Sequence, residues 1–284
     1  MHGKVIASVR GGIGNQLFCW AATYAAARRA GLDLVLECSS YKRDGYGRAY
    51  LLPKLGIEGL HESSHSLLER VVFQRLAWLA IRNRGHIRLP GCKMYTDDPG
   101  VLNSALLGST LTGRCYLWGY WQSDRYFKEY RSELRQAVRL RPCRENHVGT
   151  DAVCVHIRSY REESLPSRFH LTKQYYEAAY ERCLERMSHP RFVVYSDDLQ
   201  WAKDRELLPA AYEIGGGSHT SGCVGHDLCD LVTMSQFRNY VIANSSFSWW
   251  AAYLSDDGAW IQAPAPDRAC WFNEDPLPAE WDKL

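Results

Sequence analysis

The stretch KVIASVRGGIGNQLFCWAATYAAARRAGLDLVLE, residues Lys4 to Glu37, decides the fold class. Its apolar start, Lys4–Val9, predicts a buried strand, and the Ala-rich segment that follows predicts a helix ended by Gly31. Leu32–Glu37 then predicts a second strand. Because such crossovers are right-handed and place their strands side by side in a parallel sheet, the chain is expected to begin as a βαβ unit.

The glycine-rich turn inside this stretch resembles a dinucleotide-binding turn, but it is incomplete. After Gly14 the chain reads Asn15 and Gln16, where that fingerprint needs a third glycine. Glu37 stands where a ribose-binding acid would be expected. An NAD-dependent oxidoreductase is therefore kept as a disfavoured alternative.

The composition of the 284-residue chain is that of a globular protein, with 46% apolar and 23% charged residues. A net charge of +2 gives no general electrostatic basis for binding nucleic acid. The most apolar segment, Leu67–Asn83, is interrupted by charges, and no signal peptide is evident. We expect a cytoplasmic protein without a nucleic-acid partner or transmembrane segment, and peripheral membrane association stays open.

The ten cysteines are scattered through the chain and form no C-x-x-C pair, which favours reduced, mostly structural thiols. One local cluster, His219, Cys223, His226 and Cys229, contains residue types that bind zinc. Its spacing matches no standard zinc finger, so a loop followed by an ordinary helix start is the preferred interpretation.

The second half of the chain repeats the alternation of strands and helices, beginning at Asp151–Ile157. Such alternation predicts a doubly wound parallel sheet. The polar, aperiodic stretch Arg141–Thr150 separates the two halves. We place the boundary there, with one domain over residues 1–142 and another over residues 143–284.

Three strand ends of the second half carry polar residues where open α/β sheets bind ligands. His156 and Arg158 share one face of a continuing strand, and the planar guanidinium suits phosphate oxygens. Asp197 and Asp198, in the stretch VVYSDDL, are suited to a metal, a guanine edge or a helix cap, and at least one of them is expected to cap the next helix. Ser245 and Ser246 open a helix whose free backbone N–H groups form an anion site. Surface loops and plain helix caps are the alternatives for all three stretches, and Trp249 and Trp250 are expected to pack in the core.

Together these stretches resemble glycosyltransferase family 11, the α-1,2-fucosyltransferases, over nearly the whole chain. GGIGNQLF (Gly11–Phe18) is similar to the family's N-terminal signature, and GYWQSDRYF (Gly119–Phe127) to its central motif. DLVTMSQFRNYVIANSSFSWWAAYL (Asp230–Leu254) is similar to its long C-terminal motif.

The resemblance implies a GT-B type fold, with two Rossmann-like domains facing across a cleft. It implies that residues 1–142 form the acceptor side and that residues 143–284 bind GDP-fucose. The implied reaction moves L-fucose, with inversion, from GDP-β-L-fucose to the 2-hydroxyl of a terminal β-galactoside. Neither a metal nor a cofactor is expected. One motif departs from the family: H-x-R-R-G-D-Y is replaced by His156-Ile157-Arg158-Ser159-Tyr160-Arg161-Glu162, which leaves the acceptor open.

Catalytic roles follow from the charge that develops on the departing GDP. Arg158 and the helix start at Ser245 are expected to stabilise that charge, and Glu162 or Glu163 to accept the proton of the acceptor hydroxyl. The full set expected to bind the donor is Gly12, Asn15, Gln16, His156, Arg158, Asp197, Asn244, Ser245, Ser246 and Phe247.

Two further alternatives remain. A transferase that uses another sugar nucleotide or makes another linkage fits the same motifs. A non-catalytic sugar-binding protein fits the altered stretch after His156, although the retained Arg158 and serine motif argue against it.

Overall fold

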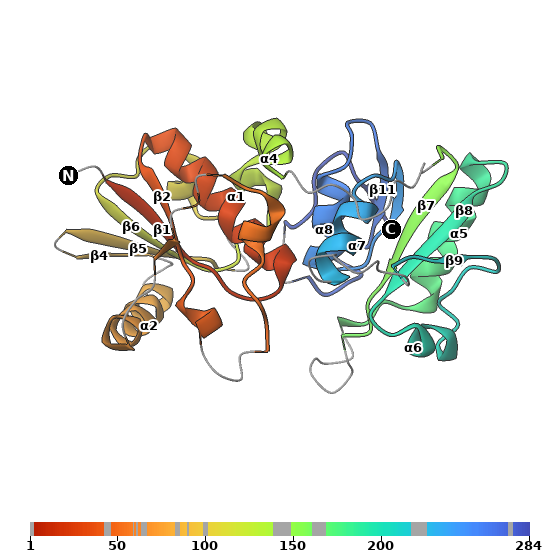
Figure 1. Cartoon of the computed structure of the whole chain (residues 1–284), viewed down its shortest axis with the longest axis horizontal. Coiled ribbons are helices and arrows are strands. Elements are labelled where there is room, and N and C mark those ends of the chain that lie inside the picture. Colours follow the sequence, from red (N-terminus) through yellow and green to blue (C-terminus); the bar gives the residue numbers. More distant parts are fainter. Residues whose placement is uncertain are drawn as a thin grey trace. The chain divides into compact units, whose positions relative to one another are not determined.

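A computed structural model (Figure 1) describes the following residues: 3–42, 47–58, 60, 62–63, 67–82, 86–89, 91–98, 102–138, 149–160, 169–216, 226–271 and 275–284. The chain divides into two compact units. Unit 1 holds Met1–Arg139 together with Phe272–Pro276, and unit 2 holds Leu140–Trp271 together with Leu277–Leu284. The chain therefore returns to unit 1 for a short segment close to its end. The assignment of the two halves to acceptor and donor stays a prediction.

Unit 1 is built on a six-stranded sheet with the order β3-β2-β1-β6-β5-β4. Its strands are β1 Lys4–Ser8, β2 Asp33–Glu37, β3 Glu62–Ser63, β4 His86–Leu89, β5 Cys92–Thr96 and β6 Arg114–Trp118. Neighbouring strands are parallel, except that β4 and β5 are antiparallel. The predicted βαβ unit is confirmed, with β1 and β2 paired from Lys4 opposite Asp33 to Ser8 opposite Glu37.

The helices of unit 1 are α1 Ile13–Ala30, α2 Leu67–Arg82, α3 Ser104–Leu107 and α4 Arg131–Ala137, with the 3₁₀ turns η1 Ser39–Lys42, η2 Leu52–Leu55, η3 Asp124–Tyr126 and η4 Lys128–Tyr130. Helix α1 starts after Gly11, whose φ of 82° favours glycine and whose added Cβ would lie 2.6 Å from Asn15 Nδ2. It ends at Gly31 in the left-handed conformation, as predicted. Helices α1 and α2 lie on opposite faces of the sheet (Figure 1).

Unit 2 contains a second six-stranded sheet, with the order β12-β11-β10-β7-β8-β9 and parallel neighbours throughout. Its strands are β7 Ala152–Ile157, β8 Arg191–Ser196, β9 Glu213–Ile214, β10 Asn239–Val241, β11 Trp260–Ala263 and β12 Asp282–Lys283. Its helices are α5 Lys173–Arg186, α6 Leu199–Asp204, α7 His226–Met234 and α8 Ser246–Tyr253. The alternation predicted for this half is confirmed.

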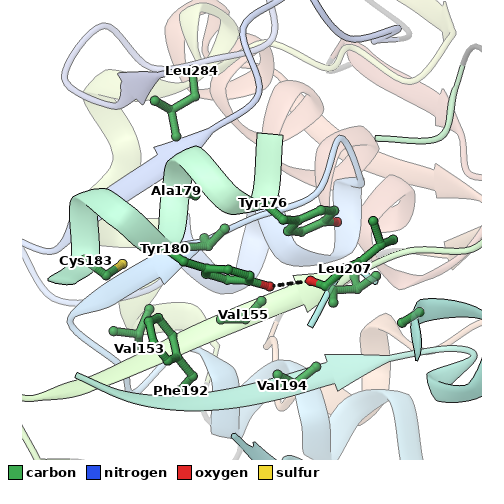
Figure 2. Packing of buried hydrophobic residues seen from close by; sticks show 13 residues of the cluster. Val153, Val155, Tyr176, Ala179, Tyr180, Cys183, Phe192, Val194, Leu207 and Leu284 are labelled. Carbon is green, nitrogen blue, oxygen red and sulfur yellow. Dashed lines mark hydrogen bonds between the residues drawn. The ribbon is translucent and has the colours of Figure 1, made fainter. Parts of the chain in front are cut away.

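The core of unit 2 lies where α5 packs on β7 and β8 (Figure 2). Val153, Val155 and Ala179 are fully buried there. The ring of Tyr180 is buried in the same cluster, and its hydroxyl donates a hydrogen bond of 2.7 Å to the Leu207 carbonyl. This bond matters because a buried hydroxyl without a partner would destabilise the core. The core holds β7 and β8 firmly, and with them the polar residues at their carboxyl ends.

No helix among the described residues is long and apolar enough to cross a membrane. Among the described cysteines, seven are free, whereas Cys229 is disulfide-bonded. The expectation of reduced thiols is therefore wrong for Cys229.

Candidate active site

The three predicted polar stretches of unit 2 meet at one edge of its sheet. They follow β7, β8 and β10, and β7 is hydrogen-bonded to both of the other strands. Parallel strands end at the same edge, so His156 near the end of β7, Asp197 directly after β8 and Asn244 shortly after β10 lie along one line of strand ends. This is the position at which open α/β sheets bind their ligands.

Asp197 connects the ends of β7 and β8. Its Oδ1 accepts a hydrogen bond of 2.8 Å from the Ser159 backbone N–H, and its Oδ2 accepts one of 3.0 Å from the Ser159 hydroxyl. Arg158 Nη1 lies 3.3 Å from the same Oδ2, and both charged side chains are mostly shielded from water. Asp197 therefore positions Arg158, and its expected contact with guanine stays a prediction. The adjacent Asp198 caps α6, accepting a bond of 2.9 Å from the Trp201 N–H, which confirms the cap expected for one of this pair.

Tyr160 connects β7 to β10. Its φ of 56° places this residue in the left-handed region, and its hydroxyl donates to the Asn244 carbonyl. The Asn244 amide donates in turn to the carbonyls of Phe169, at 3.0 Å, and Cys270, at 2.9 Å. Its Oδ1 is buried and has no hydrogen-bond partner within the described parts of the chain. A buried acceptor in this state destabilises the unit unless a ligand donates to it.

His156 is buried beside the first turn of α8, with its ring centroid 5.8 Å from that of Phe247. Burial lowers its pKa to about 3, and the positive charge of Arg158 acts in the same direction. The imidazole is therefore neutral at neutral pH. As far as the structure describes the chain, its Nδ1 is buried without a hydrogen-bond partner.

Helix α8 points its N-terminus towards the same edge. The Ser245 hydroxyl caps it, accepting from the Phe247 N–H at 3.4 Å. A helix leaves the remaining amides of its first turn without partners inside the helix, which suits them to an anion. Trp249 and Trp250 are buried, as predicted for core residues. The predicted residues Asn244, Ser245, Ser246 and Phe247 thus surround one helix start.

Gln16 has a different role in unit 1 from the one we expected. Its side chain is fully buried. Nε2 donates to the carbonyls of Gly11, at 3.1 Å, and Ala49, at 2.8 Å, and Oε1 accepts 2.8 Å from the Leu51 N–H. Both amide hydrogens are used, so Gln16 holds the segment around residue 50 against the start of α1 instead of offering a donor to a ligand.

The neighbouring residues of this motif are more open. Asn15 Oδ1 accepts 2.8 Å from Gln122 Nε2, which connects the two N-terminal motifs. A Cβ added at Gly12 would meet no atom of the described residues within 4 Å, so within this part of the chain the backbone at the start of α1 is approachable. Donor binding by Gly12 and Asn15 stays a prediction.

One carboxylate of unit 1, Asp97, is not among the site residues predicted from the sequence. Asp97 follows β5, and its Oδ2 accepts from the N–H groups of Tyr120, at 3.2 Å, and Trp121, at 2.8 Å. Desolvation raises its pKa, and its Oδ1 is buried with no hydrogen-bond partner among the described residues. Arg10 follows β1 at the same edge, with its guanidinium 3.9 Å from the Trp118 ring centroid. The sequence signal that could have found Asp97 is the pair of aspartates directly after β5, which matches the pair directly after β8.

Several predicted residues lie outside the described residues. These include the expected proton acceptors Glu162 and Glu163, and His219 and Cys223 of the zinc alternative. Among the side chains that the structure describes, no group of three or more His, Cys, Asp or Glu is placed to hold a metal ion.

Glu37, the acid expected under the NAD alternative, is buried, and its Oε1 accepts 2.8 Å from the Ser39 N–H. The side chain is thus engaged within its own turn, which counts against a ribose-binding role.

Comparison with known proteins adds a family. The sequence model of glycosyl transferase family 11 matches residues 102–281, more than half of the chain. The alpha-1,2-colitosyltransferase of Escherichia coli is 28% identical over 300 residues, covering 99% of this chain and 98% of the relative. The O-antigen biosynthesis glycosyltransferase WbnK of Escherichia coli is 25% identical over 276 residues, covering 86% of this chain and 88% of the relative.

Two solved structures of a fucosyltransferase share the architecture of this chain. The NodZ alpha-1,6-fucosyltransferase soaked with GDP-fucose has a TM-score of 0.54 at 15% identity, covering 90% of this chain and 93% of that chain. NodZ from Bradyrhizobium has a TM-score of 0.53 at 15% identity, with 90% and 94% covered. At this identity the likeness shows the fold alone, and it confirms an α/β fold of the GT-B type.

Proposed function

This chain belongs to glycosyl transferase family 11, and from that premise we propose that it transfers L-fucose, with inversion, from GDP-β-L-fucose to the 2-hydroxyl of a terminal β-galactoside. The observation that carries the proposal is the joining of three polar strand ends in unit 2. Arg158, the start of α8 and two buried atoms without a hydrogen-bond partner among the described residues, His156 Nδ1 and Asn244 Oδ1, all lie at the carboxyl ends of adjacent strands.

Departure of GDP leaves negative charge on its β-phosphate, and groups already fixed in place stabilise that charge most effectively. Arg158 meets this condition because Asp197 holds its guanidinium at 3.3 Å and the Tyr160 ring centroid lies 5.6 Å from its central carbon. The amides at the start of α8 add donors that do not move. We assign the diphosphate to these two groups.

His156 is assigned to neutral hydrogen bonding with the donor. Its lowered pKa excludes the imidazolium at neutral pH, so it neither repels Arg158 nor serves as a strong acid. Hydroxyl or amide groups of the sugar nucleotide that donate hydrogen bonds to His156 Nδ1 and Asn244 Oδ1 would give both buried atoms a partner. This polar pair gives the site a means to prefer one sugar nucleotide over another.

The acceptor is assigned to unit 1. Asp97 is held by two backbone N–H groups, and its second oxygen is available to accept from a sugar hydroxyl. Its raised pKa makes it a stronger proton acceptor than an ordinary aspartate. Glu162 and Glu163 remain predicted proton acceptors, and the cytoplasmic location expected from the sequence remains part of the proposal.

Transfer of colitose is the second candidate, because a relative covering 99% of this chain is an alpha-1,2-colitosyltransferase. Colitose is fucose without its 3-hydroxyl group. A site that hydrogen-bonds this hydroxyl discriminates strongly against the sugar that lacks it, whereas a site without such a bond accepts both. The two candidates therefore differ in one testable contact.

The test is a transfer assay of the full chain with GDP-fucose and GDP-colitose in parallel, using lactose, lacto-N-biose and related β-galactosides. We expect an α-linked product at the galactose 2-hydroxyl, identified by linkage analysis. Higher kcat/KM with GDP-colitose would select the second candidate. A product at another hydroxyl, or no turnover with either donor, would contradict the proposal. Thermal shifts with NADH and with GDP test the disfavoured oxidoreductase at the same time.

A further inference from the structure

Helix α2 carries an unusual amount of exposed apolar surface. Among the residues that the structure describes, five large hydrophobic side chains are exposed, and three of them lie on α2. Val72 is 49% exposed, Trp78 55% and Leu79 43%. Single exposed apolar residues are ordinary, but a group on one short helix marks an interaction surface.

These residues lie in one stripe with two arginines. Val72, Arg75 and Leu79 are three and four residues apart, as are Arg75, Trp78 and Arg82, so all five project from the same side of the helix. Arg75 and Arg82 are both exposed, and the Arg82 guanidinium lies 4.7 Å from the Trp78 ring centroid. We call these five residues the outward stripe.

The opposite side of α2 is already packed. Ala77 and Ala80 are buried against Met94 of β5, and Ile87 of β4 packs on the same cluster. The outward stripe is therefore not the core face of α2, because the helix makes its core contact with its other side. Its apolar residues remain on the surface of unit 1, at the side of the sheet where α2 lies in Figure 1.

We propose that the outward stripe binds the surface of an anionic phospholipid membrane. A helix that combines Trp and aliphatic side chains with arginines lies in the membrane interface, with the apolar groups among the acyl chains and the cations at the phosphates. Tryptophan favours this depth because its ring is amphipathic. Three arginines against one glutamate in the α2 sequence supply the matching charge.

A second copy of this chain fits the stripe less well. A two-fold contact between two stripes would place Arg75 and Arg82 against the same residues of the other copy, so that like charges oppose each other. A membrane offers both the apolar layer and the anionic groups that the stripe needs. The proposal is independent of the sugar donor and acceptor, because binding is measured without either.

The experiment is co-sedimentation of the full chain with vesicles of phosphatidylcholine alone or mixed with phosphatidylglycerol. We expect binding to the anionic vesicles that weakens as salt is raised. Arg75→Gln with Arg82→Gln is expected to weaken binding about fivefold for each charge removed. Trp78→Ser with Leu79→Ser is expected to weaken it about tenfold or more, including the part that salt does not remove.

Matched variants make the result specific. Arg88→Gln removes an exposed arginine one residue after Ile87, on the other face of the sheet, and Leu184→Ser removes an exposed leucine of α5 in unit 2. Both are expected to bind vesicles like the wild type. Because all these side chains are exposed, circular dichroism should show unchanged folding in every variant.

Three outcomes would overturn the proposal. The wild type does not sediment with anionic vesicles, or the stripe variants bind as well as the wild type. The third outcome is that light scattering finds a dimer of the wild type, and that Trp78→Ser with Leu79→Ser dissociates this dimer without changing the binding to vesicles. Loss of transfer activity has no part in any of these outcomes, so a failure of the proposed function is distinguished from a failure of this one.

Discussion

Nearly the same four residues stand at the ends of two strands of this molecule. The last two residues of β5 in unit 1 and the two residues after them read Tyr-Thr-Asp-Asp, residues 95–98, and the same positions at β8 in unit 2 read Tyr-Ser-Asp-Asp, residues 195–198. In each, the first aspartate accepts backbone hydrogen bonds from the loop after the neighbouring strand: Asp97 from Tyr120 and Trp121, and Asp197 from Ser159. The same local sequence therefore builds the same bridge between two strand ends.

The difference lies in what else each carboxylate meets. Asp197 also accepts from the Ser159 hydroxyl and pairs with Arg158, so both of its oxygens are engaged. Asp97 has one oxygen that finds no donor in the described residues, and its pKa is raised by burial. One aspartate thus positions a cation, whereas the other keeps an open acceptor. The local sequence places an aspartate that accepts hydrogen bonds from the neighbouring loop. The residues of that loop decide whether the second oxygen of the aspartate is paired with a cation or left to accept from a ligand.

The largest expected effect comes from removing the cation that Asp197 holds. Arg158→Ala is expected to lower kcat/KM for transfer by about a hundredfold or more, as for the loss of a group that stabilises developing charge. Steady-state assays with the donor identified above measure it. Arg125→Ala is the matched control, because Arg125 forms an exposed pair with Asp275 at 3.0 Å and is expected to change the rate by less than about twofold. A near wild-type rate for Arg158→Ala would remove the phosphate assignment.

Asp197→Asn tests whether this aspartate acts through Arg158. The amide keeps a hydrogen bond to the Ser159 N–H but loses the charge, so we expect a loss of about tenfold in kcat/KM, corresponding to about 1.4 kcal/mol. In the Arg158→Ala background the same change should cost nothing further. If Asp197 instead reads guanine, the variant should lose its preference for GDP over IDP, which lacks the 2-amino group, with or without Arg158.

The sequence was sufficient to predict the parts of the fold that depend on hydrophobic periodicity and on local helix caps and stop signals. The βαβ start, the stop at Gly31, the helix cap expected from the pair Asp197 and Asp198, and the alternation of unit 2 are all confirmed. Each is encoded within a few consecutive residues, so no distant contact was needed to predict it.

The missed elements depend on partners far along the chain. The β4–β5 hairpin went unpredicted, and the two-residue strands β9 and β12 exist only because a neighbour pairs with them. Gln16 looked like a ligand donor because its partners, Ala49 and Leu51, lie more than thirty residues away. Asp97 was missed because only the loop at Tyr120 and Trp121 shows which of its oxygens is left open.

The two strand edges are also expected to respond to acid with opposite signs. His156, beside Arg158 in unit 2, has a folded pKa of about 3, below the value of 6.5 for an unperturbed histidine. Its contribution to stability is therefore present above pH 6.5 and is lost as the pH falls towards 3, by at most about 1.4 kcal/mol per pH unit. Urea unfolding at pH 7.5, 6 and 4.5 measures this loss. His156→Asn should lose less stability than the wild type on acidification, and an equal loss in both would contradict the assignment.

Asp97 is expected to give the smaller effect, in the other direction. Its folded pKa is raised, so the group stabilises the fold fully below its unfolded value, near 3.8, and that contribution is lost as the pH rises through the folded pKa. Asp97→Asn removes the buried charge and keeps the shape. At neutral pH we expect the free energy of unfolding of the variant to equal that of the wild type or to exceed it by about 1 kcal/mol or less. In acid, where Asp97 is protonated, we expect the wild type to gain stability relative to the variant. Asp98→Asn, at an exposed position, controls for the loss of one negative charge.

The same variant tests the open oxygen of Asp97. If Oδ1 accepts from the acceptor sugar, the asparagine places either a donor or a weaker acceptor there, and KM for the acceptor should rise severalfold while the affinity for GDP stays unchanged. Isothermal titration with GDP and steady-state kinetics with varied acceptor separate the two quantities. If the affinity for GDP changes and KM for the acceptor does not, Asp97 belongs to the donor site, as Asp197 does. The assignment of Asp97 to the acceptor sugar would then be wrong.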